Sequence, residues 1–342
     1  YSIDAREEFV NKFVARAIKA NGLYEGKYPL STALGRPLIV EKLVKVAEEE
    51  NAVAIAHGCT GKGNDQVRFE VTAKALNPKL KVYAPVREWN LNREEEIKYA
   101  MAHGIEVQAK AKKYSIDQNL WGRSIEGGPL EDPWNGVGED VFEWLVPPEK
   151  APDKPTFLEI GFEKGLPVSL NGKRVNLIEL ISQVNFIAGG CGVGLIDHIE
   201  DRLVGIKSRE VYECPAAVTL LEAHKALEKM VLTRHEVFFK ELVDMEWSRL
   251  VYFGLWNEPL REDLEGFIER TQDRVEGTVR VKLYKGSVSV DGLKSPYSLY
   301  DVSLSTYGMG SKFDQRMSEG FIEIWGLQSR VGYEMLKRVK GG

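Results

Sequence analysis

The stretch with the most chemically useful side chains is the glycine-rich loop at residues 57–68, His-Gly-Cys-Thr-Gly-Lys-Gly-Asn-Asp-Gln-Val-Arg. It follows a short apolar run and precedes a helical pattern, so its backbone N–H groups could hold an anion beside the helix N-terminus. Thr60, Asn64, Asp65 and Arg68 add a hydroxyl, an amide, a carboxylate and a guanidinium. Asp65 could face an ammonium group while Arg68 and Thr60 face carboxylates, which suits a zwitterionic substrate.

The same pattern also fits a plain strand-to-helix turn, with Asp65 as the helix N-cap and Arg68 in a surface ion pair. From spacing alone this plainer interpretation is slightly favoured. The loop is not a P-loop, because Gly63 stands after Lys62 where that motif needs a serine or threonine.

The other candidate motifs predict no chemistry of their own. The glycine cluster at 189–194 lacks the G-x-G-x-x-G spacing of a dinucleotide site and follows a helix instead of a strand. The five histidines form no pair at metal-ligand spacing, and we interpret His57 as a packed core residue. The three cysteines are widely spaced and are predicted to be free thiols, without a nucleophilic role: Cys59, Cys191 and Cys214.

The elements around the loop predict a doubly wound parallel sheet of the α/β class. Apolar strands at 52–57 and 81–86 alternate with helical patterns at 66–76 and 93–103. Ligands of such sheets bind beyond the carboxyl ends of the strands, where the loop would lie. Two more helices precede them, one at 5–20 and one beginning near Pro37.

The rest of the chain predicts an α+β domain. Its expected elements are a hairpin at 157–175 turning at Asn171-Gly172, helices at 177–187, 216–230 and 236–253, and a hairpin at 278–290. The last residues carry many large apolar side chains, which pack either on another subunit or on the chain's own core. The domains we expect are a nucleotide-binding domain at 1–112, a synthetase domain at 113–319 and an oligomerisation tail at 320–342.

Composition limits the partners. The 342 residues suffice for about two domains. A net charge of -5 offers no basic face to nucleic acid, and no stretch reaches the roughly 20 apolar residues of a membrane helix. We therefore expect a cytoplasmic protein that acts on small molecules. The chain begins at Tyr1 without a methionine, and we expect its first part to be missing.

Residues 57–70, HGCTGKGNDQVRFE, resemble the second signature of the argininosuccinate synthetases. The resemblance extends over nearly the whole chain, through the segments 24–30, 36–38, 114–120, 124–133, 199–209, 211–213 and 320–322. It implies an adenine nucleotide alpha hydrolase-like domain, truncated at its N-terminus, followed by an α+β synthetase and multimerisation domain. It also implies a homotetramer.

The implied reaction joins L-citrulline to L-aspartate at the expense of ATP, giving argininosuccinate, AMP and pyrophosphate through a citrullyl-adenylate. No acid or base residue is expected, because rate would come from alignment and charge stabilisation. Mg²⁺ is implied by the pyrophosphate chemistry. Carried over by position, Gly58 would touch ATP, and aspartate would be held by Thr60, Asn64 and Asp65. Citrulline would be held by Tyr28, Asn64, Arg68, Ser115, Ser124, Glu200 and Tyr212.

Each of these roles has a plainer alternative. Ser115 could be a helix cap, Glu200 a surface ion-pair partner, and Tyr28 or Tyr212 a core ring with its hydroxyl satisfied. Where some relatives have a serine this chain has Ala33, so that contact is absent or is made by a neighbour such as Thr32.

The Ser-Gly-Gly-x-Asp-type loop that binds the ATP pyrophosphate in the family does not occur in this sequence. A polypeptide that truly starts at Tyr1 is therefore expected to be inactive. The alternatives to the ligase are an inactive amino-acid-binding or subunit-association fragment and another ATP pyrophosphatase-type ligase. A thiolating enzyme is disfavoured by the lack of a C-x-x-C pair.

Overall fold

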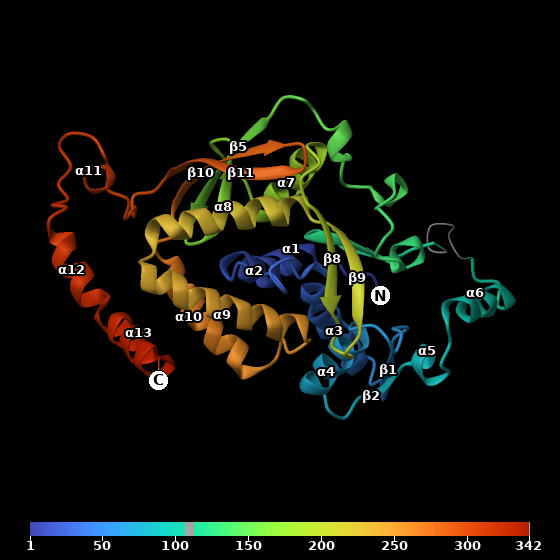
Figure 1. The fold of residues 1–342 in the computed structure, drawn as a ribbon. Helices are drawn as coiled ribbons and strands as arrows, with labels where there is room; N and C mark the ends of the chain where they lie inside the picture. Colours follow the sequence, from blue (N-terminus) through green and yellow to red (C-terminus); the bar gives the residue numbers. More distant parts are fainter. Residues whose placement is uncertain (107–112, 342) are drawn as a thin grey trace. The chain divides into compact units, whose positions relative to one another are not determined.

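The computed structural model describes residues 1–106 and 113–341. The chain forms two compact units, Tyr1–Tyr297 and Ser298–Gly342. Figure 1 shows the first unit as a mixed α/β body in which helices cover separate sheets. Among the described residues, no helix is long and apolar enough to cross a membrane.

The first hundred residues contain the predicted parallel strand pair. Strands β1 (Ala54–Ala56) and β2 (Lys81–Tyr83) run parallel, and α4 (Asp65–Leu76) connects them. Helix α3 (Ser31–Glu49) packs beside α4 and contributes Val40, Val44 and Ala47 to a small apolar core. The α/β class is therefore confirmed. The predicted helix at 93–103 is α6 (Arg93–Ala102), whereas the short α5 (Pro85–Glu88) was not expected.

The N-terminal helix has a widened turn in its middle. It consists of α1 (Arg6–Glu8), the π-helical turn η1 (Phe9–Val14) and α2 (Ala15–Lys19). All four apolar residues of η1 are buried, so the sequence pattern located the helix and its inner face.

Helix α3 begins six residues before the predicted start, and Pro37 lies inside it. A nearby side chain caps the first turn, because the Tyr28 hydroxyl accepts the backbone N–H of Thr32 at 2.8 Å. Leu30 precedes the helix with a left-handed φ of 64°. The prediction that Pro37 starts the helix was wrong, since Pro37 is its seventh residue, where it removes the N–H that would bond to the carbonyl of Ala33.

A four-stranded antiparallel sheet follows in the order β3-β4-β9-β8. Its strands are β3 (Ser115–Asn119), β4 (Gly122–Glu126), β8 (Leu195–Asp201) and β9 (Lys207–Glu213). Ser124 of β4 lies opposite Tyr212 of β9 in the register. Three short 3-10 turns lie between β4 and the next sheet: η3 (Gly128–Glu131), η4 (Glu139–Val141) and η5 (Pro148–Lys150).

The second antiparallel sheet has five strands in the order β11-β10-β5-β6-β7. Strands β10 (Gly277–Tyr284) and β11 (Ser287–Lys294) form the hairpin expected around Lys285-Gly286. The single hairpin predicted at 157–175 was wrong, because the chain reverses twice, between β5 (Thr156–Glu163), β6 (Leu166–Leu170) and β7 (Lys173–Arg174). The extra turn uses a left-handed Lys164 and Gly165, with φ values of 47° and 76°.

Four helices complete the first unit. They are α7 (Leu177–Gly190), α8 (Pro215–Val231), α9 (Arg234–Tyr252) and α10 (Pro259–Gln272), of which α10 was not predicted. Helices α7 and α8 lie against the five-stranded sheet (Figure 1). The second unit contains α11 (Val302–Ser305), α12 (Met317–Trp325) and α13 (Leu327–Lys340), and none of the three helices has a buried residue.

Candidate active site

A cleft of about 530 Å³ opens at the carboxyl end of β1, between the N-termini of α3 and α4 and the four-stranded sheet. The structure brings all ten residues singled out from the sequence to its wall: Tyr28, Gly58, Thr60, Asn64, Asp65, Arg68, Ser115, Ser124, Glu200 and Tyr212. They come from segments separated by more than a hundred residues in sequence. The cleft is therefore built by the tertiary fold.

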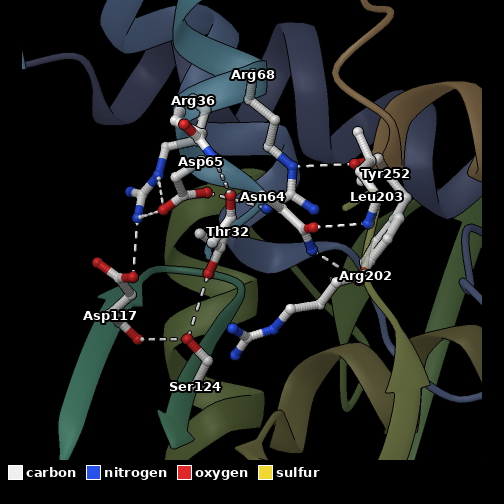
Figure 2. A network of polar contacts seen from close by, with 12 residues as sticks. Thr32, Arg36, Asn64, Asp65, Arg68, Asp117, Ser124, Arg202, Leu203 and Tyr252 are labelled. Carbon is white, nitrogen blue, oxygen red and sulfur yellow. Dashed lines mark hydrogen bonds and ion pairs between the residues drawn. The ribbon is translucent and has the colours of Figure 1, made fainter. Parts of the chain in front are cut away.

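Asp65 opens helix α4 and holds two arginines. The Nη2 atom of Arg36, on α3, lies 2.6 Å from its Oδ2 atom, and Nη1 of Arg68 lies 3.0 Å from its Oδ1 atom. Burial works against the charge of Asp65, but the guanidinium groups of Arg68 and Arg36 outweigh it and lower the pKa of this carboxyl. Figure 2 shows this network.

These contacts correct the plainer interpretation of the loop. The N-cap residue of α4 is Asn64, and Asp65 is its first helical residue. Arg68 does pair with Asp65, but its side chain is only 4% exposed, so the pair does not lie on the surface.

The Arg68 guanidinium has one buried nitrogen, Nη2, whose N–H groups have no partner among the described residues. Its Nε atom donates to the backbone carbonyl of Tyr252 at 3.0 Å, and Nη1 donates to Asp65. Its Nη2 atom is buried and has no hydrogen-bond partner among the described residues. A buried cationic donor without an acceptor is costly, and a carboxylate of a bound ligand would satisfy it.

Asn64 connects the loop to the turn that follows β8. Its Oδ1 atom accepts the backbone N–H of Leu203 at 2.9 Å, and its Nδ2 atom donates to the Tyr252 hydroxyl at 2.8 Å. These two contacts also fix which way the amide points, because one side must accept and the other must donate.

Glu200 lies deep in the cleft wall and is 3% exposed. Its two carboxylate oxygens each accept a tyrosine hydroxyl, Oε2 from Tyr212 at 2.6 Å and Oε1 from Tyr252. The Tyr28 ring stacks on Tyr212 with centroids 4.3 Å apart, and burial raises the pKa of Tyr28 to about 12. Its hydroxyl therefore stays protonated at physiological pH, with its oxygen accepting the backbone N–H of Thr32.

The cleft position of these side chains bears on the plainer alternatives. Ser115 begins strand β3, so it does not cap a helix. Glu200 is buried, so it is not a surface ion-pair partner. The rings of Tyr28 and Tyr212 are buried with satisfied hydroxyls, as the alternative stated, and both also line the cleft.

Hydroxyl groups line the side of the cleft nearest β3 and β4. The Thr32 and Ser124 hydroxyl oxygens lie 3.4 Å apart, and Ser124 also donates to the backbone carbonyl of Asp117 at 3.4 Å. Thr32 faces the cleft, whereas Ala33 is buried in the main core. A hydroxyl is therefore present in the cleft wall at residue 32, next to Ala33.

His57 is partly buried, with its side chain 5% exposed, and it lies at the edge of the cleft and outside the apolar cores. Its Nε2 atom lies 3.4 Å from Oε1 of Glu70, and its Nδ1 atom accepts the backbone N–H of Cys59 at 3.3 Å. The ring thus shapes the start of the loop and also contributes to the cleft wall.

Sequence reasoning did not single out several charged residues of the cleft: Arg36, Asp117, Glu126, Arg202 and Glu210. Arg202 donates to Glu126, to Oε1 of Glu210 at 2.8 Å and to the Ser208 hydroxyl at 2.8 Å. Burial, followed by the charge of Glu126, raises the pKa of Glu210 to about 8. Arg36 and Arg202 lie within segments 36–38 and 199–209, which carried the family resemblance. That resemblance was the sequence signal by which these two residues could have been found.

The described residues, 1–106 and 113–341, contain no group of three histidine, cysteine, aspartate or glutamate side chains arranged to hold a metal ion. The three cysteines are free, as predicted from their spacing.

Comparison with known proteins gives the family. The model of the arginosuccinate synthase N-terminal HUP domain matches residues 1–106, and that of the arginosuccinate synthase C-terminal domain matches residues 114–332. The argininosuccinate synthase of Pyrococcus furiosus is 61% identical over 339 residues, which cover 99% of this chain and 82% of the relative. The enzymes of that name from Bacillus pumilus and Geobacillus thermodenitrificans are 57% and 55% identical, covering 97% and 99% of this chain and 82% and 84% of the relatives. The chain belongs to the argininosuccinate synthase family.

Proposed function

We propose that this protein joins L-citrulline to L-aspartate with consumption of ATP, forming argininosuccinate, AMP and pyrophosphate through a citrullyl-adenylate. The observation that carries the proposal is the free Nη2 donor of Arg68, buried in a cleft lined by hydroxyl, amide and carboxylate groups. A guanidinium in that state is suited to the carboxylate of an amino-acid substrate.

We assign citrulline to the side of the cleft that joins Arg68 to the four-stranded sheet. Arg68 would bind its carboxylate, and Glu200 its ammonium group, while the polar tail meets hydroxyls. The residues that we propose to contact it are Tyr28, Asn64, Arg68, Ser115, Ser124, Glu200 and Tyr212. Thr32 would add a hydroxyl in place of the serine that some relatives carry. The ureido oxygen then attacks the α-phosphate of ATP, and pyrophosphate leaves.

We assign aspartate to Thr60, Asn64 and Asp65, next to the citrulline site. Its amine displaces AMP from the activated carbon, so the two amino acids must lie in line. ATP would approach Gly58, where a built Cβ atom would meet nothing within 4 Å and the backbone is open to a ligand. No described side chain is needed as an acid or base, since alignment and fixed charges supply the rate.

We further propose that Mg²⁺ enters with the phosphates of ATP. No reaction step is assigned to it, because the described residues offer no cluster of ligands. A cytoplasmic location, a homotetramer and the division into domains at 1–112, 113–319 and 320–342 are also proposals. The tetramer is supported by the apolar side chains that α12 and α13 leave exposed, among them Phe321, Ile324 and Trp325.

The test is release of pyrophosphate on mixing the protein with ATP, citrulline and aspartate, with each omitted in turn. The intact mass of the same sample shows which residues are present. We expect release to require citrulline, and argininosuccinate to form only when aspartate is added. Pyrophosphate release that is independent of citrulline would contradict the proposal.

A matched pair of variants examines the citrulline assignment. Arg68→Lys keeps the charge but loses the forked donor, so we expect the KM for citrulline to rise roughly tenfold or more. Arg270→Lys makes the same change in an arginine paired with Asp273 on the surface and should leave that KM unchanged. Equal behaviour of the two variants would refute the role of Arg68.

A further inference from the structure

The last residue of helix α9, Tyr252, contacts three of the proposed substrate-binding residues from behind the cleft wall. It is fully buried, with 0% of its surface exposed, and its side chain does not line the cleft. Its partners are Asn64, Arg68 and Glu200. They come from the glycine-rich loop, helix α4 and strand β8, so a single residue connects three separate segments.

The hydroxyl group of Tyr252 stands between two polar side chains. It accepts an N–H of Asn64 at 2.8 Å and donates its own proton to Oε1 of Glu200. A phenol has one O–H to donate, and its oxygen can accept at the same time. The Tyr252 hydroxyl can therefore make both hydrogen bonds at once. Burial raises the pKa of Tyr252, which keeps this hydroxyl protonated at physiological pH.

These contacts determine which polar atoms of Glu200 and Asn64 remain for hydrogen bonds to a substrate. Because Tyr212 occupies the other oxygen of Glu200, the carboxylate is oriented at both ends. Because Leu203 donates to Oδ1 of Asn64 and Tyr252 accepts from its Nδ2, the amide has its second N–H and one lone pair of Oδ1 left for a substrate. Figure 2 shows Asn64, Arg68 and Tyr252 with the dashed contacts that join them.

The ring and backbone of Tyr252 also hold Arg68. The guanidinium carbon lies 4.9 Å from the ring centroid, and the backbone carbonyl accepts the Nε–H at 3.0 Å. The chain can pass this close to α4 because residue 254 is a glycine with φ of 76°, where an added Cβ would lie 2.9 Å from Cα of Arg68. The backbone that follows α9 therefore packs directly against the backbone of α4.

We infer that Tyr252 is a positioning residue for the amino-acid substrates, whose hydroxyl sets the orientation of Asn64 and Glu200. The inference rests on the proposed function and adds to it a residue that contacts no substrate. It follows from the paired contacts of one hydroxyl, since no other described residue hydrogen-bonds to both Asn64 and Glu200.

The test compares Tyr252→Phe with Tyr24→Phe. The first change removes the hydroxyl but keeps the ring and the carbonyl that contact Arg68. The second removes the hydroxyl of the ring that stacks on Tyr252, and this hydroxyl donates to the backbone carbonyl of Asp201 and also interacts with the Glu25 side chain. Initial rates of pyrophosphate release are measured while citrulline, aspartate and ATP are varied in turn, and thermal unfolding is recorded for each protein.

We expect Tyr252→Phe to raise the KM for citrulline roughly tenfold, as loss of a hydrogen bond to a charged group implies. The KM for aspartate should rise less, through Asn64, and the KM for ATP should not change. Tyr24→Phe should alter none of the three. In a Glu200→Gln background, Tyr252→Phe should raise the KM for citrulline by clearly less than in the wild type, because the two residues act through one contact.

The outcomes separate the two proposals. If the wild type shows no citrulline-dependent release, the proposed function fails and the inference falls with it. If the wild type is active but Tyr252→Phe leaves both amino-acid KM values unchanged, or raises all three alike, the inference alone is overturned.

Discussion

Arg123 and Glu213 form an ion pair beneath the cleft, with Nη1 lying 2.5 Å from Oε2 and side chains 1% and 0% exposed. They are cross-strand partners of β4 and β9, and the next pair in the register is Ser124 with Tyr212. Successive residues of a strand point to opposite faces, so the ion pair lies on one face of this sheet and the proposed citrulline contacts on the other. The other Glu213 oxygen accepts three consecutive backbone N–H groups, at residues 143–145.

Replacing Arg123 should therefore destabilise the protein strongly. In Arg123→Met the Glu213 carboxylate loses its buried countercharge, and we expect the free energy of unfolding to fall by about 3–5 kcal/mol. Urea unfolding followed by circular dichroism measures this. The matched control is Arg280→Met, which breaks the more exposed cross-strand pair with Asp291 and should cost less than about 1 kcal/mol. A similar loss in both variants would contradict the prediction.

Asp65→Asn should lower both stability and activity. The carboxylate is needed by Arg36 and Arg68, and its loss should cost about 3 kcal/mol at pH 7. Since the pKa of Asp65 is lowered in the folded protein, its contribution is present above the ordinary value of 3.8 and is lost as pH falls below it. The difference between the two proteins in urea unfolding should thus shrink in acid. Asp153→Asn, in an exposed pair with Lys285, should behave as the wild type.

For Glu210 we expect the opposite dependence of folding stability on pH. Its folded pKa of about 8 exceeds the ordinary value of 4.5, so the folded state binds more protons and loses stability as pH rises between these values. Glu210→Gln cannot lose a proton. Its unfolding free energy relative to the wild type should increase, by about 3 kcal/mol, between pH 5.5 and 8. A constant difference across this range would show that Glu210 does not titrate there.

The thiol of Cys59 should react slowly although it lines the cleft. Burial raises its pKa to about 11, so little thiolate is present at pH 8. Alkylation by iodoacetamide, followed by mass spectrometry, should be slower than for a free cysteine and slower still with citrulline, aspartate and ATP bound. Cys191 and Cys214 are buried and should react only after unfolding. Rapid labelling of Cys59 that is unaffected by the substrates would contradict both expectations.

Much of the fold followed from patterns that are local in the sequence. The strands of the parallel pair, helix α4 and the hairpin at Lys285-Gly286 all carry periodicity or turn signals. Helix α3 was placed wrongly because its first turn is capped by the hydroxyl of Tyr28, four residues before Thr32, and a tyrosine there is not one of the side chains that mark a helix start. The double reversal of 157–175 was missed because two turn signals occur there and only Asn171-Gly172 was used.

Prediction of the cleft residues depended on a different kind of information. The resemblance supplied ten residues that the structure brings together, whereas spacing alone favoured a plain turn at Asp65. Neither source could give Tyr252, because it lies at the end of an ordinary amphipathic helix and acts through hydrogen bonds to Asn64 and Glu200. Such a role becomes visible only when the distant segments are seen in contact.

The contact between Asn64 and Leu203 joins positions 139 residues apart in the chain. Closing so long a loop has a large entropic cost that must be met before any contact across it can stabilise the protein. Helices α3 and α4 are stabilised by local contacts and can form before this loop closes. The opposite wall of the cleft is in place only after the loop has closed. On dilution from denaturant, recovery of catalytic activity should therefore lag behind recovery of helical circular dichroism, and a kinetic intermediate would be helical yet unable to bind citrulline.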